Sequence, residues 1–310
     1  MNIVFLDSAT LTDLPAQLDR LRELGQCTFH ESTEPGDAVA RLAGAQVAIS
    51  NKVYLGEPEL TQLPDLRLIC IAATGKNNVD LPAAERRNVA VRNVSGYSTE
   101  SVAQLTLTAL FSVAMDITYL NEACYDGTYA ASAKFSYWRR PFFELRGKRH
   151  GIIGLGTIGR RVAELVEAFG GEVVYYSTSG RNVAQRYESL PLAELLRTCD
   201  SVSIHCPLNA ATENLLGTKE LAYMKPSAYL VNVARGGIVN EVALVRAINE
   251  NVIAGAAVDV FTAEPLPADH PYHGVKDRNR LLLTPHIGWA SVEARTALVD
   301  GIVDNIQEGW

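Results

Sequence analysis

The 310-residue sequence lacks any apolar run long enough for a transmembrane helix, and Met1–Asp7 lacks the charged start and cleavage site of a signal peptide. It also lacks a basic surplus, since 28 Lys and Arg stand against 35 Asp and Glu, for a formal net charge of -7. A chain without surplus cations cannot neutralise many phosphates. Neither nucleic acid nor a membrane is therefore expected as a partner.

Cysteines are few and show no pairing pattern. The five residues are an odd number without C-x-x-C spacing, so neither a disulfide framework nor a zinc site is predicted. His270 and His273 form H-x-x-H on a loop punctuated by prolines, with no suitably spaced third ligand, and we interpret them as ordinary loop histidines. We expect no metal site and a cytoplasmic location.

The segment Tyr125–Arg149 has little periodicity and carries seven aromatic residues together with Gly127 and Gly147. Its aromatic surface favours an arm packed on a partner subunit, although packing within the chain explains it nearly as well. The basic cluster from Arg139 to Arg149 is interrupted by Phe142 and Phe143, so we interpret it as a solvated connector.

The remaining pattern alternates strands and helices, and the length suggests two domains. This alternation predicts a parallel α/β fold. Strands are expected at residues 2–7, 47–50, 66–73, 89–94, 148–153, 172–177, 201–205, 228–233, 253–260 and 281–283. Helices are expected at residues 11–24, 98–121, 157–169, 190–196, 219–224, 241–249 and 291–307.

The most informative stretch is a glycine turn between a short apolar strand and a helix. Gly154 lets the chain leave the strand sharply, Gly156 lets the backbone approach a pyrophosphate, and Gly159 lets the helix pack on the strand. The helix N-terminus offers free N–H groups to phosphates. A strand, glycine turn, helix and second strand within about thirty residues is the context that a dinucleotide fingerprint requires.

Three polar clusters directly follow predicted strands in the second half of the chain, and they contain Arg235, Glu264 and His286. Taken singly, each residue has an ordinary explanation, such as a surface ion pair or a loop histidine. Open α/β sheets bind ligands at the carboxyl ends of their strands, so the three can converge there. In the first half, Thr74–Gly75 and Asn51–Lys52 follow strands in the same way, and could provide backbone N–H groups and a cation for a carboxylate.

The chain resembles the D-isomer-specific 2-hydroxyacid dehydrogenases over essentially its full length. The matching segments are Gly151–Gly159, His205–Leu208, Asn232–Gly237, Ala257–Phe261, Ala263–Leu266 and Thr284–Gly288. The resemblance implies a Rossmann-type dinucleotide-binding domain, residues 98–289, inserted into a flavodoxin-like α/β substrate domain, residues 1–97 plus 290–310. It also implies a homodimer.

The resemblance also implies residue roles. Arg235 would grip the substrate carboxylate and ketone oxygen, His286 would exchange a proton with that oxygen, and Glu264 would orient the imidazole. The substrate would also meet Asn51, Lys52, Thr74 and Gly75. The expected cofactor contacts are Gly154, Gly156, Thr157, Ile158, Gly159, Ser177, Thr178, Ser179, Arg181, His205, Cys206, Pro207, Val233, Ala234 and Asp259, the last beside the nicotinamide carboxamide.

The sequence departs from the common family pattern at the cofactor's ribose. An NAD enzyme usually places Asp or Glu at the end of the second strand, whereas here that end reads Tyr176-Ser-Thr-Ser-Gly-Arg181. No carboxylate would repel a 2′-phosphate, and Ser177, Thr178, Ser179 and Arg181 could bind one. We therefore favour NADP over NAD.

The favoured function is hydride transfer between NAD(P)H and a small 2-keto acid, glyoxylate or hydroxypyruvate, giving the D-2-hydroxy acid. The alternative is a dinucleotide-sensing, corepressor-like interaction protein of the same superfamily, which the absence of an extended tail disfavours. A methyltransferase is disfavoured because the matching motifs continue beyond the glycine turn. Resemblance to formate dehydrogenase is disfavoured because that branch pairs its histidine with glutamine, where this chain has Glu264.

Overall fold

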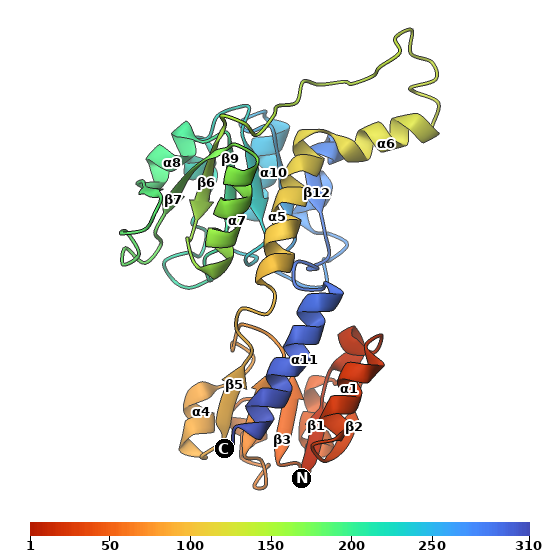
Figure 1. The fold of residues 1–310 in the computed structure, drawn as a ribbon, viewed down its shortest axis with the longest axis vertical. Helices are drawn as coiled ribbons and strands as arrows, with labels where there is room; N and C mark the ends of the chain where they lie inside the picture. Colours follow the sequence, from red (N-terminus) through yellow and green to blue (C-terminus); the bar gives the residue numbers. More distant parts are fainter. The chain divides into compact units, whose positions relative to one another are not determined.

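The computed structural model describes all 310 residues and divides into two compact units (Figure 1). The first unit contains Met1–Ser98 and Ala290–Trp310, and the second contains Thr99–Trp289. Each unit is built on one parallel sheet with helices on both faces. The predicted parallel α/β class is therefore confirmed.

The first unit has a five-stranded sheet in the order β2-β1-β3-β4-β5, which is the flavodoxin-like order. Helices α2, α3 and α4 cover one buried face, while the C-terminal helix α11 packs against β4, β5 and α1, and α1 also packs against β2. The strands are β1 (Asn2–Phe5), β2 (Gln26–Phe29), β3 (Val47–Ser50), β4 (Leu68–Ile71) and β5 (Ala90–Asn93). The helices are α1 (Pro15–Arg22), α2 (Ala38–Arg41), α3 (Glu57–Leu60), α4 (Leu81–Arg86) and α11 (Val292–Gln307).

The second unit has a seven-stranded parallel sheet in the order β12-β11-β10-β9-β6-β7-β8, so that β7 and β8 are added on one side of β6 and β9 to β12 on the other. This is the Rossmann order with one further strand. Its strands are β6 (Arg149–Ile153), β7 (Glu172–Tyr176), β8 (Glu188–Ser189), β9 (Ser201–Ile204), β10 (Tyr229–Asn232), β11 (Gly255–Val258) and β12 (Leu281–Leu283).

Two apolar cores lie on opposite faces of this sheet. Helices α5 and α7 bury one core, while α8, α9 and α10 bury the other. The central strands β9, β10 and β11 are buried on both sides; β10 and β11 are largely apolar, whereas β9 carries serines at alternate positions. The helices are α5 (Thr99–Ala114), α6 (Ile117–Tyr125), α7 (Thr157–Ala168), α8 (Leu192–Thr198), α9 (Thr218–Leu221) and α10 (Glu241–Asn249).

The single helix predicted over residues 98–121 is wrong. Asp116 takes a left-handed conformation with φ +60° and separates α5 from α6, which bend by 59°. Its carboxylate is buried and accepts hydrogen bonds from Arg139 and Arg140, so tertiary contacts override the helical pattern of the sequence. The interpretation of Arg139 and Arg140 as solvated connector residues is wrong for the same reason.

Two further differences concern the edge of the first unit. The helix predicted over residues 11–24 begins only at Pro15, after a separate 3-10 turn at Ser8–Leu11. The strand Gln26–Phe29 was not predicted, since it has only four residues and none of them is buried. Elsewhere the predicted segments overlap the observed elements, with ends shifted by one to two residues at most sites.

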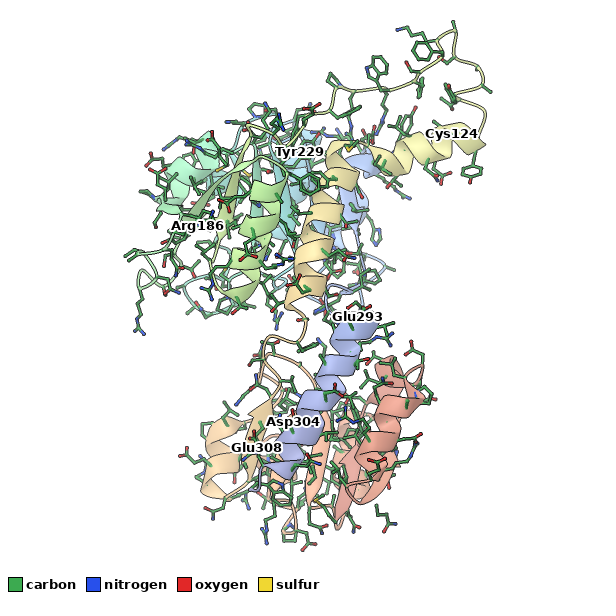
Figure 2. All side chains as sticks on the ribbon, viewed as in Figure 1. Cys124, Arg186, Tyr229, Glu293, Asp304 and Glu308 are labelled. Atoms are coloured by element: carbon green, nitrogen blue, oxygen red, sulfur yellow. The ribbon has the colours of Figure 1, made fainter.

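Helix α6 and the irregular chain after it extend away from the body of the second unit (Figures 1 and 2). Cys124 lies on α6 and is exposed, whereas Cys70, Cys199 and Cys206 are buried and Cys27 is intermediate. Burial raises the pKa of the Cys70 and Cys199 thiols to about 12. No single helix has the length and apolarity to cross a membrane, although the bent α5–α6 pair matches on those two criteria alone.

Candidate active site

The glycine turn after β6 has the contacts that its sequence predicts. Gly154 has φ +94°, and a Cβ there would lie 2.8 Å from the backbone nitrogen of Cys206. A Cβ at Gly159 would lie 2.4 Å from the Gly154 carbonyl oxygen, so the helix can pack this closely only with glycine. A Cβ at Gly156 would meet no protein atom within 4 Å. The protein therefore leaves open space at the N-terminus of α7, as a pyrophosphate requires.

The polar residues at the end of β7 also leave hydrogen-bonding capacity unused. The Ser177 hydroxyl is buried without a protein partner. The chain turns back at Gly180, whose N–H donates to the Ser177 carbonyl oxygen (3.2 Å), and Arg181 is exposed on the loop. The only carboxylate of this strand is that of Glu172 at its opposite end. The pattern fits a ribose or a ribose phosphate.

His286 and Glu264 come together as predicted. His286 Nδ1 lies 2.8 Å from Glu264 Oε2, and both side chains are about one quarter exposed. Glu264 Oε1 accepts a hydrogen bond from the Phe261 N–H (3.0 Å), which fixes the carboxylate. With Nδ1 directed at a carboxylate, Nε2 is the imidazole nitrogen left to exchange a proton with a substrate.

Asp259 has a structural role that the sequence did not reveal. Its buried carboxylate accepts hydrogen bonds from the Thr284 hydroxyl (2.6 Å) and from the N–H groups of Ile287 (2.9 Å) and Gly288 (2.8 Å). These contacts enclose His286, which has φ +54°. A left-handed histidine is strained and persists where its surroundings fix it. Asp259 therefore holds the loop that presents the imidazole, beyond the cofactor contact expected of it.

A second buried polar residue, Asn232, holds the Arg235 loop. Its amide nitrogen donates to the Arg235 carbonyl oxygen (2.9 Å), and its amide oxygen accepts from the Ala234 N–H (3.1 Å). A Cβ on Gly236 would lie 2.0 Å from the Phe261 carbonyl carbon, so this loop packs directly against the segment that leads to Glu264. The Arg235 guanidinium is half-buried and donates to the Ala234 carbonyl oxygen (2.7 Å).

His205, predicted as a cofactor contact, belongs to a buried polar chain. Its Nε2 lies 2.8 Å from the Ser203 hydroxyl, which also contacts His150 Nε2 (2.8 Å), and His150 Nδ1 reaches the Ser201 hydroxyl (2.7 Å). Burial lowers the pKa of His150 to about 4; burial and, secondarily, the His150 charge lower that of His205 to about 3. Both imidazoles are therefore neutral at pH 7.

In the first unit, the two predicted substrate loops lie side by side. The Asp7 carboxylate accepts hydrogen bonds from the N–H groups of Asn51 (2.8 Å) and Lys52 (2.6 Å). Burial raises the pKa of Asp7, although these hydrogen bonds oppose the shift. The Asn78 amide joins the loops by donating to the Val53 carbonyl oxygen (3.3 Å), and Asn93 fixes Thr74 through its carbonyl oxygen (2.6 Å). The role of Asp7 in holding the Asn51–Lys52 loop was not predicted, although its position directly after a buried strand was a signal in the sequence.

The second unit thus combines a dinucleotide-binding turn with an acid–base pair and a guanidinium at adjacent loops. Val233 and Ala234 are buried beneath the Arg235 loop, Thr157 and Ile158 open helix α7, and Pro207 follows Cys206 against the glycine turn. No group of three or more His, Cys, Asp or Glu side chains is placed to hold a metal ion. Fold and loops together define a nicotinamide-dependent oxidoreductase.

Comparison with known proteins gives the family. Residues 107–288 match the NAD-binding domain of the D-isomer-specific 2-hydroxyacid dehydrogenases. The chain is 37% identical to a putative 2-hydroxyacid dehydrogenase of Haemophilus influenzae, over 99% of this chain and 98% of that one. It is 35% identical to a glycerate dehydrogenase of Methylorubrum extorquens, over 98% and 95%.

Among solved structures, the fold is similar to that of an NADPH-dependent glyoxylate/hydroxypyruvate reductase of Sinorhizobium meliloti in complex with NADP and malonate. The TM-score is 0.84 at 27% identity, over 99% of this chain and 92% of that one. The chain belongs to the D-isomer-specific 2-hydroxyacid dehydrogenase family. It is an oxidoreductase that uses NAD or NADP to interconvert 2-keto and 2-hydroxy acids, and the corepressor-like alternative gains no support.

Proposed function

We propose that this enzyme reduces glyoxylate and hydroxypyruvate with NADPH, giving glycolate and D-glycerate. The observation that carries the proposal is the His286–Glu264 pair at 2.8 Å, held in one loop cluster with Arg235. Relatives support the choice of small acids, because they include enzymes named glycerate dehydrogenase, hydroxypyruvate reductase and glyoxylate reductase.

The chemistry follows from the positions of the donors. Arg235 binds the substrate carboxylate and the keto oxygen as a planar fork, which orients the keto carbon. A nicotinamide cofactor held at the glycine turn would supply the hydride. His286 donates its Nε2 proton to the keto oxygen and accepts it back in the oxidation direction, while Glu264 holds Nδ1. We also assign substrate contacts within the first unit, to the backbone N–H groups of Thr74 and Gly75 and to the Asn51–Lys52 loop.

The preference for NADPH rests on the loop after β7. The partnerless Ser177 hydroxyl and exposed Arg181 would bind the 2′-phosphate, with Thr178 and Ser179 beside them. The glycine turn and the first residues of α7 would hold the pyrophosphate, and Asp259 would lie next to the carboxamide. The Sinorhizobium neighbour, which has NADP in its structure, supports the same choice.

We also propose that the enzyme is a cytoplasmic homodimer and that the arm after α6 contributes to its interface. Exposed aromatic side chains lie at the end of α6 and along the arm: Tyr125 (84% exposed), Phe135 (94%) and Trp138 (54%). Apolar surface of this kind on an extended segment is typical of a subunit contact. Light scattering of the purified chain tests this assembly.

Initial rates of NADPH and NADH oxidation with glyoxylate, hydroxypyruvate, pyruvate and phenylpyruvate test the reaction and the cofactor together. We expect turnover of the first two acids with NADPH. Arg181→Ala should raise the KM for NADPH about tenfold without changing that for NADH, since a charge-assisted contact is lost. The matched control is Arg186→Ala on the same loop, where the guanidinium is bound to Glu167. NADH bound at least about tenfold more tightly than NADPH would overturn the cofactor assignment.

A further inference from the structure

The second unit contains another pair of a histidine and a glutamate besides His286 and Glu264. Glu241 is the first residue of α10, and its Oε2 lies 2.9 Å from His270 Nε2. Their side chains are 13% and 4% exposed, so this pair is more deeply buried than His286 and Glu264. His270 is therefore not the ordinary loop histidine that the sequence indicated.

The contacts of His270 fix the position of its ring proton. A backbone N–H can only donate, so the Tyr272 N–H, 3.2 Å from Nδ1, makes Nδ1 an acceptor. The ring proton is therefore on Nε2, which donates to Glu241. The imidazole also packs against the Tyr272 and Phe261 rings, with centroids 4.7 Å and 6.0 Å away. His270 thus holds the Glu241 carboxylate in one orientation.

The other oxygen of Glu241 holds the segment that leads to Glu264. Glu241 Oε1 accepts a hydrogen bond from the Thr262 N–H (2.8 Å). The N–H of the preceding residue, Phe261, donates to Glu264 Oε1 (3.0 Å). Two consecutive N–H groups are therefore bound by two different carboxylates, and the second carboxylate is the one that contacts His286.

The Phe261–Thr262 peptide unit also contacts the loop that carries Arg235. A Cβ on Gly236 would lie 2.1 Å from the Phe261 carbonyl oxygen and 2.4 Å from the Thr262 nitrogen. Packing this close transmits a displacement instead of absorbing it. One peptide unit therefore supports both the Glu264 segment and the Arg235 loop, and Glu241 binds its N–H.

We propose that Glu241, held by His270, is a positioning residue for the reaction. It fixes the Phe261–Thr262 peptide unit, and through that unit the contact between Glu264 and His286. Both of its oxygens are bound by the protein, so it acts through Glu264 and not on the substrate. This inference rests on the proposed function, because it takes Glu264 and His286 as the acid–base pair.

A double-mutant cycle of Glu241→Gln with Glu264→Gln tests the inference. A glutamine at position 241 can accept from the Thr262 N–H, but its amide nitrogen then meets the His270 Nε2–H, which is also a donor. We expect Glu241→Gln to lower kcat about tenfold in the parent enzyme, because a small misplacement of an acid–base pair is costly. In the Glu264→Gln background the same change should lower kcat less than about twofold. The KM for the nucleotide should not change, since the glycine turn is intact.

The cycle separates positioning from folding. A loss of folded protein lowers kcat by the same factor in both backgrounds, whereas a residue that acts through Glu264 has no further effect once that carboxylate is gone. Glu241→Asp keeps the charge on a shorter side chain and is measured in the same cycle. It should lower kcat about threefold with the same non-additivity, so the test does not depend on whether Glu241→Gln folds.

The first matched control is Asp200→Asn. Asp200 accepts hydrogen bonds from the Arg149 N–H (3.0 Å) and from the Lys225 ammonium group (2.8 Å), so its partners are a backbone N–H and a side-chain donor, as for Glu241. It directly precedes β9 and therefore lies at the amino end of the sheet. Asp200→Asn should change kcat less than about twofold in either background.

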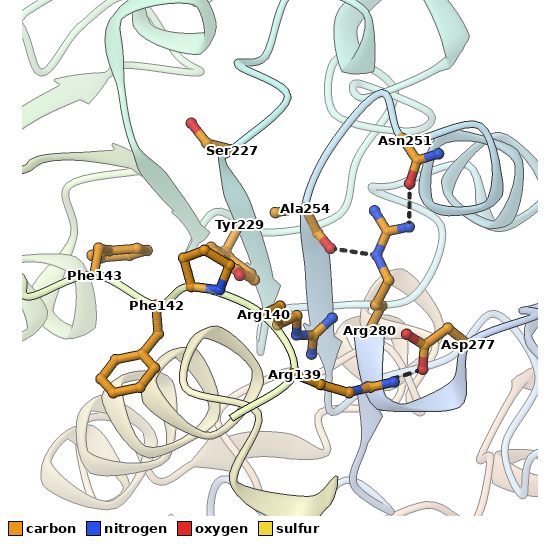
Figure 3. Close-up of a pocket in the computed structure, with 11 residues that line it drawn as sticks. Arg139, Arg140, Phe142, Phe143, Ser227, Tyr229, Asn251, Ala254, Asp277 and Arg280 are labelled. Carbon is orange, nitrogen blue, oxygen red and sulfur yellow. Dashed lines mark hydrogen bonds and ion pairs between the residues drawn. The ribbon is translucent and has the colours of Figure 1, made fainter. Parts of the chain in front are cut away.

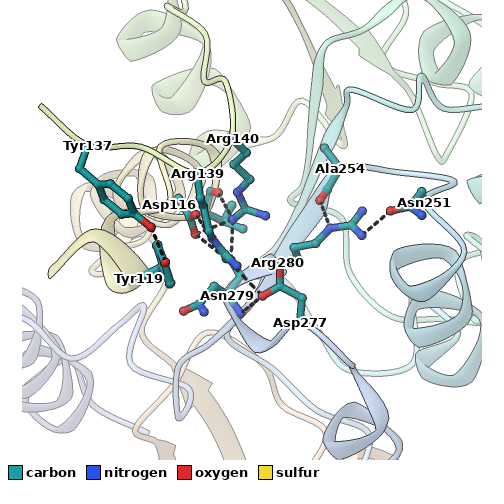
Figure 4. A network of polar contacts seen from close by, with 11 residues as sticks. Asp116, Tyr119, Tyr137, Arg139, Arg140, Asn251, Ala254, Asp277, Asn279 and Arg280 are labelled. Carbon is teal, nitrogen blue, oxygen red and sulfur yellow. Dashed lines mark hydrogen bonds and ion pairs between the residues drawn. The ribbon is translucent and has the colours of Figure 1, made fainter. Parts of the chain in front are cut away.

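The second matched control is Asp277→Asn, near the amino ends of β10 to β12 (Figure 3). Asp277 accepts hydrogen bonds from the Asn279 N–H and from the Arg139 guanidinium, both at 3.2 Å (Figure 4). Its partners are again a backbone N–H and a side-chain donor, and the expected kcat is within about twofold of the parent value.

The activities are measured with whichever keto acid and nucleotide give the fastest turnover, so the test does not depend on the identity of the substrate. The inference is overturned if Glu241→Gln and Glu241→Asp both leave kcat within about twofold of the parent value, or lower it equally in both backgrounds. An unchanged kcat in Glu264→Gln alone would instead overturn the proposed acid–base pair, and this inference with it.

Discussion

The two ends of the seven-stranded sheet hold charged groups in different ways. At the carboxyl ends, buried Asp259 accepts hydrogen bonds from the loop that carries His286, and buried Asn232 donates one to the backbone of the loop that carries Arg235. The imidazole Nε2 and the guanidinium group remain for a ligand. At the amino ends, Arg139, Arg140 and Arg280 use much of their hydrogen-bonding capacity on protein acceptors.

This difference shows that one sheet can place catalytic residues at one end and residues that stabilise the fold at the other. At the carboxyl ends, buried Asn232 and Asp259 fix the backbone of the loops that carry the reactive side chains. The reactive side chains themselves therefore need not stabilise the fold. The amino-end arginines bridge the arm, the end of α5 and the turn before β12. Substitutions at the carboxyl end should therefore affect turnover, and those at the amino end should affect stability.

The largest expected effect is on turnover at the carboxyl end. His286→Ala removes the proton donor and should lower kcat by roughly a hundredfold to ten-thousandfold, because general acid catalysis has that magnitude. Cofactor affinity, measured by fluorescence titration, should not change. His273→Ala, an exposed loop histidine, serves as the control. A kcat within a few-fold of the parent enzyme would contradict the assignment.

Acid should destabilise the second unit, because unfolding allows His150 and His205 to be protonated. His150 and His205 have pKa values of about 4 and about 3 when folded, against 6.5 in the unfolded chain. Because the unfolded state binds protons more readily, stability is complete above pH 6.5 and falls as the pH drops toward 4. At pH 5 each histidine should cost about 2 kcal/mol.

Denaturant unfolding between pH 7.5 and pH 5 measures this loss. His150→Leu should remove about half of the pH dependence, whatever it does to stability at pH 7.5. An unchanged slope in that variant would show that other groups cause the acid sensitivity.

At the amino end, Asp116→Asn should destabilise the protein by about 3 kcal/mol, since a buried partner of two guanidinium groups loses its charge. Asp277→Asn is the control, because that carboxylate is one third exposed and its pair should be worth less than about 1 kcal/mol. Thermal and denaturant unfolding measure both. If Asp116→Asn left stability unchanged but abolished turnover, it would contradict the expectation that residues at the amino ends of the strands stabilise the fold rather than act in turnover.

The smallest expected effect is on kcat in variants that test how Asp259 holds the His286 loop. Asp259→Asn replaces an acceptor with a donor near the N–H groups of Ile287 and Gly288, and should lower kcat about tenfold by loosening the His286 loop. Thr284→Val removes one hydrogen bond to the same carboxylate and should lower kcat only a few-fold. A rise in cofactor KM alone, with kcat retained, would instead leave Asp259 with a cofactor role only.

Much of this architecture could be predicted from local sequence, because most of the central strands are rich in apolar residues and the glycine turn has a fixed spacing. The pairing of Glu264 with His286 was also predicted, although the two are 22 positions apart. The break at Asp116 could not be predicted, since it depends on arginines more than twenty residues later. The structural role of Asp259 could not be predicted either, since its hydrogen-bond partners lie in the loop after β12 and come close to it only in the folded sheet.

Helix α6 offers a practical consequence for experiments on the enzyme in solution. Cys124 is the one exposed thiol among the five, while burial raises the pKa of Cys70, Cys199 and Cys206 to about 12, about 12 and about 11. A maleimide dye added near neutral pH should therefore react at α6 first. The native sequence already contains a labelling position from which fluorescence anisotropy can follow the arm, with no engineered cysteine.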